Sequence, residues 1–152
     1  MTTTFETLDE LRGAAGQQLG WTEWIDITQE RVNLFADATG DQQWIHVDVE
    51  RANAESPFGG PIAHGYLTLA LSNLFLPELL AVPGASAGVN YGTDKVRFPS
   101  PVPVGCRVRG GAEITAVAEI SGGVQTTITI TIQVEGQDKP ACVIESLSRW
   151  LS

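Results

Sequence analysis

Residues 63–76 read AHGYLTLALSNLFL, a stretch that is apolar on nearly every side. A helix of this composition is expected to be enclosed by other elements rather than to lie on the surface. The stretch contains Thr68, Ser72 and Asn73 and is shorter than the roughly 20 residues needed to span a bilayer. Pro77 follows and is expected to stop or bend the helix. We therefore predict a buried central helix and no membrane partner.

The second half of the chain changes to the two-residue period of β-strands. In residues 127–134, isoleucines and a valine alternate with threonines and a glutamine, which gives the segment one apolar and one polar face. Further strands are expected at about 87–98, 104–118 and 141–151, separated by the turn sequences PSP, SGG and EGQ. One long helix followed by consecutive strands favours an α+β fold with an antiparallel sheet wrapped around the helix.

The first half of the chain is expected to present polar groups beside that helix. An early strand is predicted at 18–27, and Thr28 can cap a short helix that Gly40 ends, just before Asp41. Residues 41–62 contain two prolines, so we predict an irregular, folded-over loop there. Loops of this kind often hold catalytic groups.

Composition limits the partners and the cellular compartment. At 152 residues the chain fits one domain, and its net charge of −9 disfavours nucleic acid as a partner. The two cysteines are too few for a disulfide framework and lack the spacing of a zinc site, so we expect reduced thiols and no metal. The N-terminus has no basic start before an apolar run, which argues against a secretory signal. The expected location is cytoplasmic.

The only two histidines, His46 and His64, lie in one short region with Asp41. An aspartate and a histidine on one loop can hold a water between them and move protons near neutral pH. The helix start at His64-Gly65 adds backbone N–H groups that can stabilise a developing oxyanion. Structural roles are the alternative: Asp41 as a turn residue, Gly65 for close helix packing, and His64 as a hydrogen-bond donor to the loop.

The motifs ATGD (38–41), HVD (46–48) with Ala52, and FGG through AHG (58–65) resemble the MaoC-like hydratase/dehydratase family. The segment KVRFPSPV (95–102) extends the resemblance, which covers roughly residues 20–150. Many family members have Asn-Pro where this chain has Gln43-Trp44, a departure that bears on substrate range. The resemblance implies a single MaoC-like hot-dog domain over residues 1–152, similar to single hot-dog (R)-specific enoyl-CoA hydratases.

What the resemblance implies for chemistry is hydration of trans-2-enoyl-CoA to (3R)-hydroxyacyl-CoA, or the reverse dehydration, in fatty acid metabolism. Asp41 and His46 would form the acid/base dyad, and the backbone amide of Gly65 would bind the thioester oxyanion. No cofactor is implied beyond the coenzyme A of the substrate, and a homodimer is expected. Residues expected to bind the acyl-CoA or acyl-carrier-protein thioester are Trp44, Phe58, Ile62, His64, Lys95, Arg97 and Arg109.

Several alternatives stay open from the sequence. The basic residues Lys95, Arg97, Arg107 and Arg109 would receive the substrate phosphates, or they would form a solvated strand face, because residues two apart on a strand share a side. The same fold also hosts acyl-CoA thioesterases. A non-catalytic acyl-thioester binder, or a stabilising subunit of a dehydratase complex, would keep the fold without turnover.

Overall fold

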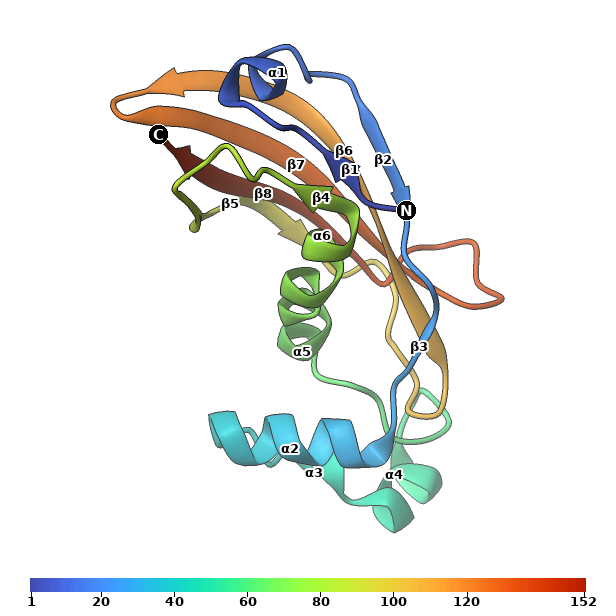
Figure 1. Ribbon diagram of the computed structural model, residues 1–152. Coiled ribbons are helices and arrows are strands. Elements are labelled where there is room, and N and C mark those ends of the chain that lie inside the picture. Colours follow the sequence, from blue (N-terminus) through green and yellow to red (C-terminus); the bar gives the residue numbers. More distant parts are fainter.

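In the computed structural model, which describes residues 1–152, a curved antiparallel sheet wraps around a central helical segment (Figure 1). The strand order is β2-β6-β7-β8-β5, and β3 also pairs with β6. This is the hot-dog arrangement that was expected. The strands are β2 (Gln18–Trp21), β3 (Ile25–Asp26), β5 (Ala87–Arg97), β6 (Arg107–Ile120), β7 (Gly123–Val134) and β8 (Cys142–Leu151). The short strands β1 (Thr3–Thr4) and β4 (Leu80–Ala81) form a separate parallel pair.

The central segment consists of α5 (Gly65–Ala70) and α6 (Ser72–Leu79), with Leu71 between them. The interruption lies here rather than at Pro77, because the N–H groups of both Leu74 and Phe75 bond to the carbonyl of Leu71 and tighten the turn. Pro77 lies on the exposed side of α6, and the helix continues past it to Leu79. No helix of the structure is both long and apolar enough to cross a membrane.

One side of this helical segment packs on the sheet. Its buried residues Leu67, Leu71, Phe75 and Leu79 recur every fourth position and join the isoleucines of β7 in one core. Gly110 of β6 allows the close approach, since a Cβ added there would lie 2.6 Å from the Phe75 side chain. The opposite side is not enclosed by this chain, contrary to the sequence expectation. Tyr66 is 71% exposed and Leu74 is 42% exposed.

Three helices form a layer at the far end of α5 (Figure 1): α2 (Gln29–Thr39), α3 (Trp44–Val47) and α4 (Val49–Glu55). The Thr28 hydroxyl accepts the backbone N–H of Arg31, and Gly40 ends α2 with a φ of 83°, both as predicted. The expectation of an irregular loop at 41–62 was wrong for the segment 44–55, which contains α3 and α4, whereas residues 41–43 and 56–61 are irregular as expected. Asp48 caps α4 by accepting the N–H of Arg51, which stabilises a helix before the first proline of this region.

Two further boundaries differ modestly from the sequence prediction. The early strand expected at 18–27 is split into β2 and β3, with Thr22 between them bonded to Gly110 through both its backbone N–H and its hydroxyl. A short helix, α1 (Leu8–Arg12), precedes β2 and buries Leu8 and Leu11 against the core.

Candidate active site

The fold brings Asp41, His46 and His64 together from three segments. Asp41 follows α2, His46 lies in α3, and His64 immediately precedes α5. One potential ligand atom from each of the three side chains lies within 4.8 Å of the others. The two histidines are buried and Asp41 is exposed. The cluster therefore combines two buried imidazoles with one carboxylate that is open to solvent.

The hydrogen bonds of His46 determine which ring nitrogen is available for proton transfer. Its Nδ1 lies 2.7 Å from the backbone oxygen of Ile62. A carbonyl oxygen only accepts, so Nδ1–H is the donor and the neutral ring carries its lone pair on Nε2. The side-chain amide of Gln29 donates to the His46 carbonyl at 2.7 Å and holds the short helix α3 in place. Nε2 of His46 is thus a positioned proton acceptor.

Asp41 is held by the turn that ends α2. Its Oδ1 accepts the backbone N–H of Gln43 at 3.3 Å, and its own N–H lies 3.3 Å from the Thr39 hydroxyl. No cation pairs with its carboxylate. A carboxylate with few partners beside a free imidazole nitrogen can exchange protons with a water or a substrate carbon.

A cavity of about 420 Å³ lies next to this cluster. It shares Ile62, whose carbonyl orients His46, and Gly65, the first residue of α5. A Cβ at Gly65 would meet the Phe98 ring at 3.4 Å, so the glycine keeps the backbone accessible from the cavity. The lining residues are Phe58, Ile62, Ala63, Gly65, Thr68, Phe98, Pro99, Ser100, Pro101, Val102 and Ala141. The mostly apolar wall suits an aliphatic chain.

Phe58 and Ile62 were expected to bind substrate, and both line this cavity. Residues 98–102 form another wall of the cavity, and none of them was expected to bind substrate. The segment KVRFPSPV was expected to supply the end of a strand, two cations and a turn, and nothing in its spacing indicates that it folds back onto residues 58–65. The backbone bond from Ala63 to Val102 makes that contact.

The remaining expected substrate-binding residues lie outside the cavity lining. His64 is only 2% exposed and therefore has almost no surface for substrate. The ring of Trp44 is half-buried under the Arg51 guanidinium, 4.2 Å from the ring centroid. Lys95 and Arg97 are exposed on β5, and Arg97 directly precedes the cavity residue Phe98.

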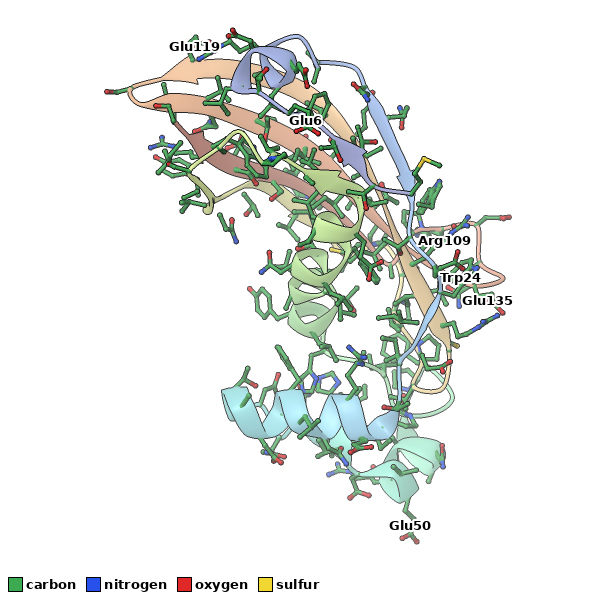
Figure 2. The ribbon with its side chains drawn as sticks, in the orientation of Figure 1. Glu6, Trp24, Glu50, Arg109, Glu119 and Glu135 are labelled. Atoms are coloured by element: carbon green, nitrogen blue, oxygen red, sulfur yellow. The ribbon has the colours of Figure 1, made fainter.

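Arg109 does not belong to the site. Its guanidinium lies 4.6 Å from the ring centroids of both Trp21 and Trp24, and its Nε donates to Gln133. Figure 2 shows Arg109 beside Trp24 on the outer side of β6, away from α5. The cause is strand alternation: Val108 and Gly110 point to the core, so Arg109 between them points outward.

The geometry of the cluster does not favour a bound metal ion or a cysteine nucleophile. Asp41, His46 and His64 are the one group that could hold a metal ion. The two imidazoles, however, stack with centroids 3.9 Å apart and planes inclined by 28°, so their in-plane lone pairs do not converge on one position. Cys142 is no nucleophile, because burial raises the pKa of its thiol to about 11. Acid/base chemistry remains.

Known proteins resemble this chain both in sequence and in fold. The family model for the MaoC like domain matches residues 10–136. 3-Hydroxyacyl-thioester dehydratase Z of Mycobacterium tuberculosis is 53% identical over 150 residues, which cover 98% of this chain and 99% of that protein. Nodulation protein N of Rhizobium meliloti is 44% identical over 140 residues, covering 89% and 85%. The solved (R)-hydratase from A. caviae involved in PHA biosynthesis has a TM-score of 0.74 at 25% identity, covering 90% of this chain and 96% of that one.

Proposed function

This chain belongs to the MaoC-like domain family, and we propose that it catalyses the reversible hydration of trans-2-enoyl-CoA to (3R)-hydroxyacyl-CoA. The observation that carries the proposal is the orientation of His46, whose Nδ1 is bonded to Ile62 so that Nε2 is free, and whose side chain clusters with that of Asp41 beside an apolar cavity. The names of the similar dehydratase and hydratase support a thioester substrate and the (R) configuration.

The proposed reaction balances with these groups alone. Water gives one proton to the Asp41–His46 pair while its oxygen bonds to Cβ of the enoyl thioester. The pair returns one proton to Cα, so the dyad ends the cycle in its starting protonation state. Negative charge that develops on the thioester oxygen is stabilised by the backbone N–H of Gly65, which has no partner within its own helix.

The proposal is tested with purified protein, EDTA and trans-2-enoyl-CoA substrates of several chain lengths. We expect loss of the conjugated-thioester absorbance, unaffected by the chelator, and a (3R)-hydroxyacyl-CoA product by chiral analysis. Release of free CoA would instead identify a thioesterase. Binding without turnover, for CoA and carrier-protein thioesters alike, would identify an acyl-thioester binder or a stabilising subunit.

Lys95 and Arg97 bind the substrate phosphates in this proposal, since both are exposed cations on the strand that leads to the cavity wall. Arg97→Glu is expected to raise KM for enoyl-CoA at least about tenfold and to leave kcat unchanged, because a charge-assisted bond to phosphate is lost and a repulsion is gained. Steady-state kinetics measure this. Arg12→Glu makes the same charge change at α1 and should leave KM unaltered; an equal rise in both variants would refute the assignment.

The active form in this proposal is a homodimer. Strand β5 is at the end of the sheet, and none of its eleven residues is buried. Tyr66 and Leu74 on the helix, with Val89 and Tyr91 on β5, are large exposed apolar side chains. An open strand edge with apolar neighbours is a surface that proteins normally cover. Light scattering at micromolar concentration should therefore give twice the 16.3 kDa of one chain, and a monomer would contradict this expectation.

A further inference from the structure

His64 contacts both members of the proposed dyad. Its Nε2 lies 3.0 Å from the backbone oxygen of Asp41, and its ring stacks on that of His46 with centroids 3.9 Å apart. Phe35 of α2 also contacts the His64 ring, at 4.9 Å between centroids. The next residue along the chain is Gly65, the proposed oxyanion donor. His64 therefore lies where the segments that carry all three functional groups meet.

The protonation of His64 follows from its one side-chain hydrogen bond. The carbonyl of Asp41 can only accept, so Nε2–H donates and, in the neutral ring, Nδ1 carries the lone pair. That Nδ1 is buried and has no hydrogen-bond partner. An unsatisfied buried nitrogen costs stability, which an apolar ring of similar size would avoid. If this position served packing alone, an apolar ring would therefore be more stable here than a histidine.

We propose that His64 is a positioning residue for hydration: it holds the Asp41 turn at a fixed place relative to His46 and Gly65, without touching the substrate. The inference rests on the proposed function. It departs from the substrate-binding role expected from the sequence, because His64 is 2% exposed and has almost no surface that a substrate could contact. The hydrogen bond fixes the backbone of Asp41, and the stacked ring fixes the plane of His46.

Two substitutions separate positioning from packing. His64→Phe keeps a stacking ring and removes the bond to Asp41, so kcat should fall about 10- to 100-fold with KM within about twofold, while the thermal midpoint stays equal or rises. His64→Gln retains an amide donor that can reach the Asp41 carbonyl, and it should recover part of the lost kcat. Wild-type kcat in His64→Phe would overturn the proposal. So would a raised KM at unchanged kcat, which indicates a substrate contact.

Thr126→Val is the matched control for loss of a buried hydrogen bond. The Thr126 hydroxyl is fully buried and accepts the indole N–H of Trp150 at 2.9 Å, remote from the dyad. This variant should lose stability and keep kcat. If Thr126→Val lowers kcat as much as His64→Phe does, the effect is general and the positioning role is refuted.

Nuclear magnetic resonance tests the arrangement without any turnover. Because the chain has two histidines, a long-range ¹H–¹⁵N spectrum at alkaline pH contains two imidazole patterns. We expect one ring protonated on Nδ1, His46, and one protonated on Nε2, His64, with the second pattern missing in His64→Phe. A proton on Nδ1 of His64 would overturn the inference. A wild-type protein that hydrates no enoyl thioester refutes the proposed function instead, and the spectrum still decides the geometry.

Discussion

Asp41→Asn is expected to lower kcat for hydration by about 10²- to 10⁴-fold and to leave the fold unchanged. The amide has the size of the carboxylate and its oxygen can still accept the N–H of Gln43, so the turn after α2 is preserved. It cannot accept a proton from water or return one to Cα. Steady-state rates with the best enoyl-CoA substrate measure the loss, and circular dichroism with the thermal midpoint establishes that the variant is folded.

His46→Gln and the double variant show whether the two side chains act as one unit. Groups that share a proton-transfer step lose activity together, so the double variant should be little slower than the more damaged single variant. Additive losses would indicate two independent roles. An Asp41→Asn protein with wild-type kcat would exclude the dyad altogether.

Phe75→Ala is expected to lower the free energy of unfolding by about 3–5 kcal/mol. The Phe75 side chain is fully buried and lies directly over Gly110 of the sheet, so its removal leaves a cavity in the core. Urea denaturation followed by circular dichroism measures the change. All variants are compared at one protomer concentration, because the proposed dimer would make apparent stability depend on concentration.

Leu34→Ala is the matched control, since the Leu34 side chain is 63% exposed on α2. Its free energy of unfolding should change by about 0.5 kcal/mol or less. A loss below about 1 kcal/mol for Phe75→Ala would mean that the helix does not pack on the sheet as described.

The local features of this protein could be predicted from the sequence because each depends on neighbours in the chain. The alternation in residues 127–134 predicts β7, the apolar stretch 63–76 predicts the central helix, and Thr28 and Gly40 mark the ends of α2. Asp41 and His46 were singled out because they lie on one short segment and can move protons near neutral pH, and their pairing as a dyad came from the resemblance of the surrounding motifs to the family.

Features that depend on distant segments could not be predicted in this way. The cavity wall at residues 98–102 meets residues 58–65 through long-range contacts such as the bond from Ala63 to Val102, and Arg109 points away from the site because of its phase on β6. The helix capped by Asp48 is a local feature that the prolines of the same region obscured. The exposed side of the central helix could not be predicted either. An apolar helix sequence does not show whether this chain covers both sides of the helix.

The sequence by itself determined the kinds of groups in the candidate site, namely Asp41, the two histidines and the start of the central helix, on an α+β fold. Only the tertiary structure decided what each histidine can do. The carbonyl of Ile62 leaves Nε2 of His46 free, and the carbonyl of Asp41 turns His64 inward. The first bond joins residues 16 positions apart and the second joins residues 23 positions apart. Contacts of His64 with Phe35 of α2 and with His46 of α3 set that geometry rather than any local pattern.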